Sequence, residues 1–124
     1  MKKRKPKWRA DLPIYRQIVE IVIERLIRGK YAEGDLLPSV RQLSDEHDVS
    51  TLTAAKVHQE LSGLGVFEKR RGIGLEVKAG ARARLLENER RRFWNEQWPL
   101  LEQRLELLDI DVAQLQRRRS DDQS

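Results

Sequence analysis

The chain of 124 residues carries a net charge of +5, with 36% charged, 39% hydrophobic and 6% aromatic residues. This length suits one compact domain with an appendage and excludes a second full ligand-binding domain. The sequence contains no cysteine, which excludes disulfides, thiol catalysis and cysteine-based metal sites. No signal-peptide core or membrane span follows the basic start, so we expect a cytoplasmic protein that does not enter a membrane.

The positive charge is concentrated at the start of the chain. Six Lys and Arg residues lie within the first nine positions, whereas residues 10–78 hold ten cations against 11 acids. Residues 1–10 show no apolar period and are expected to form a basic disordered arm. That arm is either a solvated tail or a segment that contacts phosphates, and the sequence leaves both readings open.

From Asp11 onward, apolar residues recur at spacings of three and four and predict a helix that stops at Arg28-Gly29. The apolar positions of this helix are Ile14, Ile18, Ile21, Val22 and Leu26. A short second helix is expected over residues 39–47, because Ser39 and Gln42 have the spacing of a capping box.

Ser50 is expected to cap a third helix that runs to about Leu61. Its predicted buried stripe consists of Ala54, Val57, Leu61 and Leu64. At 100° per residue, the opposite face holds Leu52, Ala55, Lys56 and Gln59. We expect a helix that turns this face to solvent to present it to a partner.

Two alternating segments, Val66–Lys69 and Leu75–Lys78, flank the letters RRGIG and predict a two-stranded hairpin. The two glycines are weak evidence for nucleotide binding, because phosphate-binding glycine loops open a helix and Gly74 opens a strand. The fold class is therefore mainly α with a small β-hairpin (α+β). The order of elements over residues 11–78 is that of a winged helix-turn-helix domain.

Residues 79–118 are expected to form a C-terminal helical dimerisation region, and residues 119–124 a disordered tail. A long helix is predicted over residues 82–108, with a kink at Pro99, before a turn and a last short helix. The residues expected in the dimer interface are Leu86, Phe93, Trp94, Trp98, Leu101, Leu105 and Leu108. An intramolecular helical hairpin, or tryptophans lining a small-molecule pocket, are the alternatives.

The sequence offers no pattern for catalysis. The two histidines, His47 and His58, are eleven residues apart and lack an accompanying carboxylate motif. No pair of a nucleophile and a base is recognisable either. We therefore expect no catalytic residues, no metal, no cofactor and no enzymatic activity.

Residues 13–77 resemble the DNA-binding domain of the GntR family of bacterial transcription regulators. The resemblance rests on the stretches PIYRQI, GDLLPSVRQL and RRGIG, in the order and spacing of that family. The short tail with two predicted helices is similar to the YtrA-type branch, whose members lack a large effector domain and dimerise through the tail. The resemblance implies a winged helix-turn-helix that binds double-stranded DNA.

The same resemblance implies which residues contact DNA. Ser39 and Arg41 occupy positions that hold backbone phosphates, and the position of Arg41 also allows contact with a base. Thr53 matches a threonine near the start of the recognition helix, and Lys56 matches a basic position one turn further on. The three residues Arg70, Arg71 and Gly72 match the wing that enters the minor groove.

The segment at the start of this helix departs from the family pattern. YtrA-type relatives commonly have Asn-Pro-Asn-Thr where this chain has Ser50, Thr51, Leu52 and Thr53. Ser50 preserves the capping role, but Leu52 offers only an apolar contact, such as with a thymine methyl group. The operator sequence therefore cannot be transferred from relatives.

These observations predict a homodimeric, sequence-specific DNA-binding regulator, most simply a repressor, that acts on a pseudo-palindromic operator. The alternative is a winged-helix module that binds RNA or protein without operator specificity. The sequence identifies neither an effector nor the regulated genes.

Overall fold

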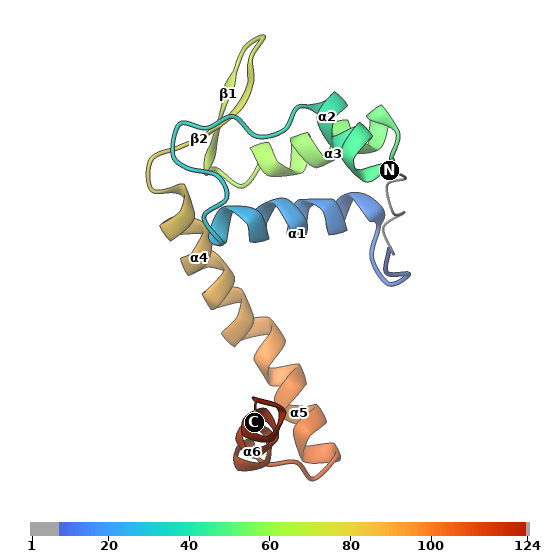
Figure 1. Ribbon diagram of the computed structural model, residues 1–124, viewed down its shortest axis with the longest axis vertical. Helices are drawn as coiled ribbons and strands as arrows, with labels where there is room; N and C mark the ends of the chain where they lie inside the picture. The colour runs from blue at the N-terminus through green and yellow to red at the C-terminus, as the bar shows by residue number, and fades with distance from the viewer. Residues whose placement is uncertain (1–7, 124) are drawn as a thin grey trace. The chain divides into compact units, whose positions relative to one another are not determined.

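The computed structural model describes residues 8–123 (Figure 1). Its elements, in chain order, are α1 (Ile14–Ile27), α2 (Val40–His47), α3 (Thr51–Ser62), β1 (Phe67–Arg70), β2 (Gly74–Val77), α4 (Ala81–Arg92), the π-helical turn η1 (Phe93–Gln97), α5 (Trp98–Leu107) and α6 (Val112–Gln123). The predicted fold class is confirmed. The chain divides into two compact units, the first ending at Leu86 and the second beginning at Glu87. Among the described helices, none has the length and apolar character needed to cross a membrane.

The core of the first unit lies where α1 and α3 pack together. α1 contributes Ile18, Val19, Val22 and Leu26, and α3 contributes Ala54, Val57 and Leu61, all of them buried. The predicted stripe of α3 is therefore confirmed, with Leu64 packed against its edge. On α1, Ile14 is 39% exposed because it is the first residue of the helix, and Val19 is buried although the sequence pattern did not single it out.

Both predicted helix caps are present. Ser39 and Gln42 form a reciprocal capping box, in which the Gln42 N–H donates to Ser39 Oγ at 3.1 Å and the Ser39 N–H donates to Gln42 Oε1 at 2.8 Å. Ser50 Oγ accepts the Thr53 N–H at 3.1 Å. Because each cap satisfies a backbone donor that the helix itself leaves free, both helix starts are fixed by local sequence.

The hairpin is tied to the helices by the segment that precedes α2. β1 and β2 pair antiparallel, with Phe67 opposite Val77 and Arg70 opposite Gly74. The Gly34 and Leu37 N–H groups donate to the carbonyls of Val77 and Leu75, each at 2.8 Å. These two hydrogen bonds hold the segment before α2 alongside β2, and so join the base of the hairpin to the helix-turn-helix.

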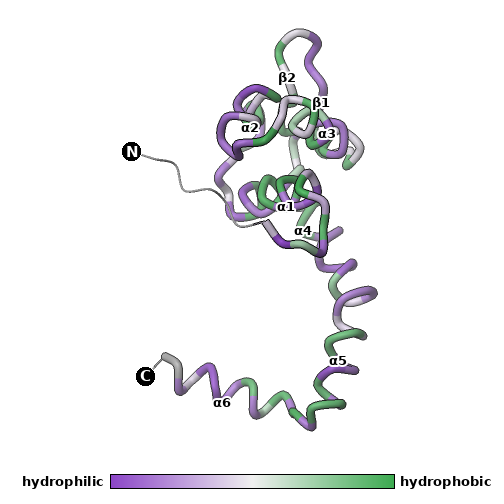
Figure 2. Tube along the Cα trace, turned by 90° about the vertical axis from the view of Figure 1, so that its right-hand side faces the viewer, coloured by the Kyte–Doolittle hydropathy of each residue, from purple (hydrophilic) through white to green (hydrophobic). Residues whose placement is uncertain are grey.

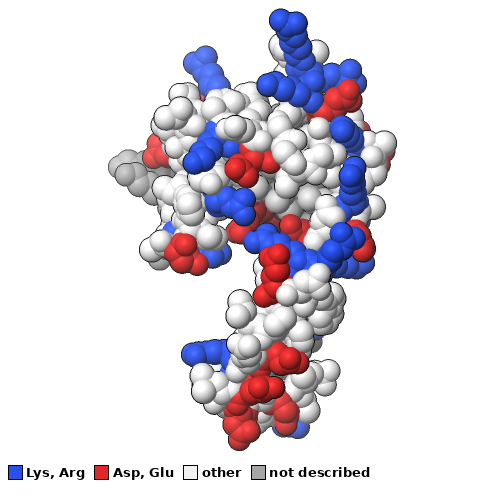
Figure 3. Space-filling view, turned by 180° about the vertical axis from the view of Figure 1, so that it is seen from behind, with Lys and Arg blue, Asp and Glu red and all other residues white. Residues whose placement is uncertain are grey.

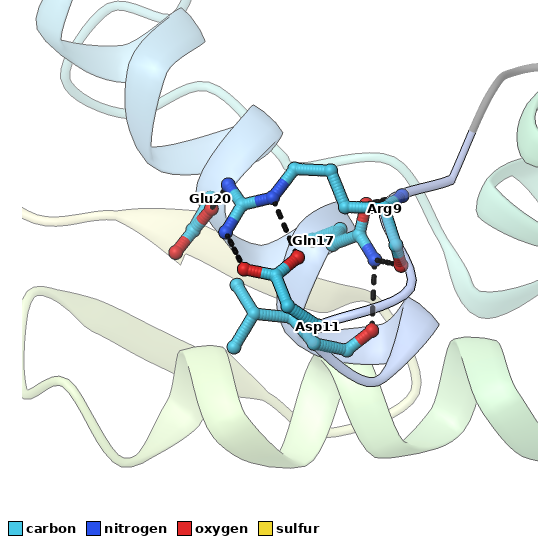
Figure 4. A network of polar contacts seen from close by, with 5 residues as sticks. Arg9, Asp11, Gln17 and Glu20 are labelled. Atoms are coloured by element: carbon cyan, nitrogen blue, oxygen red, sulfur yellow. Dashed lines mark hydrogen bonds and ion pairs between the residues drawn. The ribbon is translucent and has the colours of Figure 1, made fainter.

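The predicted disordered arm over residues 1–10 is wrong for residues 8–10; residues 1–7 lie outside the described part of the chain. Trp8 packs partly buried against the core. The Arg9 N–H donates to Gln17 Oε1, and Gln17 Nε2 donates to the carbonyls of Arg9 and Leu12, each at 2.8 Å (Figure 4). Gln17 is buried on α1, so its amide needs these partners, and the arm's last residues supply them.

Helix geometry changes before Pro99 rather than at it. η1 occupies Phe93–Gln97, and Pro99 lies in the first turn of α5. Proline lacks an N–H and its ring crowds the carbonyl four residues earlier, here that of Asn95, so a wider π-helical turn accommodates it. A π-helical turn thus directly precedes Pro99, the residue at which the sequence predicts a kink.

The predicted disordered tail over residues 119–124 is wrong as far as Gln123, because α6 continues to that residue; Ser124 lies outside the described range. Asp109 has a φ of 53° and ends the preceding helix. Asp111 and Gln114 then form a second reciprocal cap, with both hydrogen bonds at 2.8 Å. A capped start followed by Gln and Arg residues, which favour helix, supports the whole segment.

Candidate nucleic-acid interface

The start of α2 presents Ser39 and Arg41. The Ser39 oxygen accepts the capping hydrogen bond from Gln42, and its hydroxyl proton is free to donate outward because no group among the described residues accepts it. Arg41 is exposed in the first turn. The positive end of a helix with an adjacent guanidinium favours an anionic group such as a phosphate.

The start of α3 carries Ser50, Thr51 and Leu52, which depart from the family pattern, and Thr53, which matches it. The Ser50 hydroxyl contacts Thr53 Oγ1 at 3.0 Å, so Ser50 acts mainly as a cap that orients Thr53. Thr51 is exposed, and the Leu52 side chain is 82% exposed. At this exposure the Leu52 side chain contributes little to the packing of the first unit.

Lys56 lies one turn further along α3 on the exposed side. Its Nζ is placed over the ring of Tyr15 on α1, 4.2 Å from the ring centroid. The sequence did not single out Tyr15, because a contact between residues 41 positions apart leaves no periodic signal. The side chain of Lys56, which is predicted to contact DNA, is therefore anchored on the Tyr15 ring rather than freely solvated.

The hairpin places the three predicted wing residues in different environments. Arg70 lies within β1 opposite Gly74, and not in the turn, where the sequence pattern predicts it. Its Nε donates to Glu76 Oε2 at 2.7 Å, and its Nη2 lies 3.8 Å from Glu68 Oε2. The hydrogen bond to Glu76 raises the pKa of Arg70 above its ordinary value. Two carboxylates therefore share the charge of Arg70.

Arg71 and Gly72 form the tip with Ile73. The Ile73 N–H donates to the Arg70 carbonyl at 2.9 Å, and Gly72 has a φ of +75°, which an L side chain rarely adopts. Arg71 is exposed, and no carboxylate of the described residues lies within 4.0 Å of it. Arg71 is thus an unneutralised cation at the tip of the wing.

A groove of about 640 Å³ runs between α3 and the hairpin. Its lining includes Gln59 from α3 and Lys69, Arg70 and Ile73 from the hairpin. Figure 3 shows Lys and Arg side chains gathered where the hairpin projects, with carboxylates beside them. Neither Lys69 nor Ile73 is among the residues predicted to contact DNA, although the run of three cations from Lys69 to Arg71 is a signal for Lys69.

The two histidines do not assemble a catalytic or metal centre with their neighbours. His58 Nε2 lies 2.7 Å from the Pro38 carbonyl and joins α3 to the turn before α2. His47 is 6% exposed, and burial lowers its pKa. Over residues 8–123, no three His, Cys, Asp or Glu side chains are grouped as metal ligands.

The second unit carries an exposed apolar face that includes most of the residues predicted for the dimer interface. Trp94 is 60% exposed, and Phe93, Leu101 and Leu108 are also exposed, whereas Trp98 and Leu105 are half-buried. Leu86, also predicted for the interface, is half-buried and belongs to the first unit. The rings of Phe93, Trp94 and Trp98 form one cluster, with centroids 5.1 to 6.5 Å apart. Hydrophobic segments recur along α5 and into α6 (Figure 2).

Residues 14–77 match the family described as bacterial regulatory proteins, gntR family. The HTH-type transcriptional repressor YtrA of Bacillus subtilis is 35% identical over 81 residues, which cover 65% of this chain and 62% of YtrA. The uncharacterized HTH-type transcriptional regulator YhcF of the same organism is 37% identical over 67 residues, which cover 54% of this chain and 55% of YhcF. The chain thus matches less than two thirds of the length of either relative.

A solved structure of a GntR family transcriptional regulator from Listeria monocytogenes has the same fold, with a TM-score of 0.73 at 24% identity. The alignment covers 92% of this chain and 98% of that one. The family match and the similarity to YtrA confirm the predicted resemblance to YtrA-type regulators of the GntR family. Because the family match covers more than half of the sequence, the chain belongs to the gntR family of bacterial regulatory proteins.

Proposed function

We propose that this protein is a sequence-specific DNA-binding regulator of transcription. The proposal rests on two features that occur together. The capped helix α3 exposes Leu52 and Lys56, and the tip of the hairpin exposes Arg71, whose charge is not neutralised. Exposed apolar and cationic side chains on a capped helix suit base edges in a major groove. The names of YtrA and YhcF as HTH-type transcriptional regulators support the same reading.

In the proposed complex, α3 enters the major groove and the hairpin tip reaches the adjacent minor groove. Leu52 and Thr53 face bases at the start of α3, and Thr51 lies beside them. Arg71 enters the minor groove, where a narrow groove concentrates negative potential, and Gly72 permits close approach of the backbone. Ser39 and Arg41 hold phosphates that fix the orientation of the domain.

We further propose that two copies associate through the exposed apolar face of the second unit. A face that includes an exposed Trp94 and Leu101 is larger than single scattered apolar residues would explain. A two-fold dimer would place two recognition helices in successive major grooves, and the operator would be a pseudo-palindrome with half-sites about 34–36 Å apart. Repression would follow from occupying promoter DNA, the role that YtrA's name assigns to that relative.

A winged-helix module that binds RNA or protein is the second candidate, and its support is the exposed basic wing. The discriminating experiment incubates the purified full chain with a random duplex library and sequences the retained DNA. We expect an enriched pseudo-palindromic site that outcompetes scrambled duplex and RNA of the same length. Equal retention of the selected site, the scrambled duplex and the RNA would refute operator recognition and favour the alternative.

A further inference from the structure

Two neighbouring contacts join the start of α1 to the outer face of α3. The Lys56 Nζ lies 4.2 Å from the centroid of the Tyr15 ring, and Arg16 Nη1 lies 3.4 Å from Glu60 Oε2. Tyr15 and Arg16 are adjacent on α1, whereas Lys56 and Glu60 are one turn apart on α3. Tyr15 is half-buried against the core, so its ring has a fixed position.

This arrangement controls which partner the Lys56 ammonium meets. On an isolated helix, a lysine and a glutamate four residues apart attract each other and share their charge. Here Arg16 holds the Glu60 carboxylate, and within the described residues no carboxylate lies within 4.0 Å of Lys56. The aromatic face attracts the ammonium without cancelling its charge.

An aromatic anchor also limits the conformations of a long side chain. Lysine loses substantial rotamer freedom when it becomes fixed on binding, and a contact that restricts it beforehand reduces that loss. The ring contacts one side of the ammonium, so N–H donors on the other side remain available to a phosphate or a base edge.

We propose that Tyr15 is a positioning residue that holds Lys56, still charged, in the orientation used for DNA. The inference rests on the proposed function, since it assigns Tyr15 a task only if α3 contacts DNA. Tyr15 itself need not contact the nucleic acid. Arg16 serves the same arrangement by keeping Glu60 away from Lys56.

The test is a double-mutant cycle on the full chain, with Tyr15→Leu, Tyr15→Phe, Lys56→Met and the combined Tyr15→Leu/Lys56→Met variant. Affinity for the selected operator is measured by fluorescence anisotropy at two salt concentrations. We expect Tyr15→Leu to weaken binding by about two- to fivefold per half-site, the equivalent of an exposed cation–π contact. Its salt slope should equal that of the wild type, because the charge of Lys56 remains.

The Phe variant should bind like the wild type, because its ring face is retained. In the Lys56→Met background, Tyr15→Leu should cause no further loss, and thermal unfolding of each variant identifies any general loss of folding. An equal loss in both backgrounds, unchanged or tighter binding by Tyr15→Leu, or no effect of Lys56→Met would overturn the inference. Failure of the wild type to prefer the operator would instead refute the proposed function.

Discussion

Replacing Arg71 with alanine tests whether the wing contacts DNA through charge. Arg71 has no carboxylate within 4.0 Å among the described residues, so its full charge is available to a phosphate. Each neutralised phosphate contributes about 0.9 to the slope of log affinity against log salt, so two wings of a dimer contribute roughly 1.8. Between 50 and 200 mM salt, the wild type should therefore lose roughly 12-fold more affinity than Arg71→Ala.

Arg28→Ala is the matched control for that experiment. Arg28 is also exposed, but it follows the last residue of α1 and forms an ion pair with Glu24 at 2.9 Å. The control removes the same charge outside the proposed interface, and its slope should stay close to that of the wild type. Filter binding or anisotropy at four salt concentrations gives both slopes. Arg71→Ala and wild-type slopes that coincide would refute an electrostatic contact at the wing.

Three further predictions concern the recognition helix, the dimer and pH. Leu52→Ala should weaken the preference for thymine at one position of each half-site without changing the salt slope, and a selected-site profile identical to that of the wild type would exclude Leu52 from base reading. Replacing Trp94 and Trp98 together by Glu should give monomers with impaired operator binding, and light scattering that still detects dimers would remove these residues from the interface. Burial lowers the pKa of His47 below 6.5, so as the pH falls the unfolded chain protonates this imidazole before the folded chain does. The free energy of unfolding should therefore decrease as the pH drops below 6.5, by up to about 1.4 kcal/mol per pH unit. His47→Leu should flatten this decline in urea unfolding, and an unchanged decline would show that other groups cause it.

Contacts between distant elements explain most differences between the predicted and observed sites. The sequence places Arg70 beside Arg71 as an equivalent cation of the turn. The structure pairs Arg70 with Glu76 on the opposite strand, because the hairpin register brings these side chains to the same face. Register depends on where the turn closes, and the letters RRGIG permit more than one position for it.

At both ends of the chain, too, the structure differs from what the sequence predicts. The first residues lack an apolar period, yet Trp8 and Arg9 are ordered because the buried Gln17 requires partners for its amide. The last residues are polar, yet α6 continues to Gln123 behind the reciprocal cap of Asp111. Composition alone reports how much a segment can bury. It reports neither the partner that another element supplies, as for Trp8 and Arg9, nor the cap at the start of a polar helix, as for α6.

The sequence by itself determined the elements whose signals are local. Ser39 and Ser50 cap helices through hydrogen bonds to residues three positions on, and the stripe of α3 repeats within its own turns. Only the tertiary structure decided which cations are neutralised and which are anchored, since Glu76 reaches Arg70 across a strand pair and Tyr15 reaches Lys56 across two helices. A cap or a stripe depends on neighbours within one turn, whereas the state of a charge depends on every group that folding brings near it.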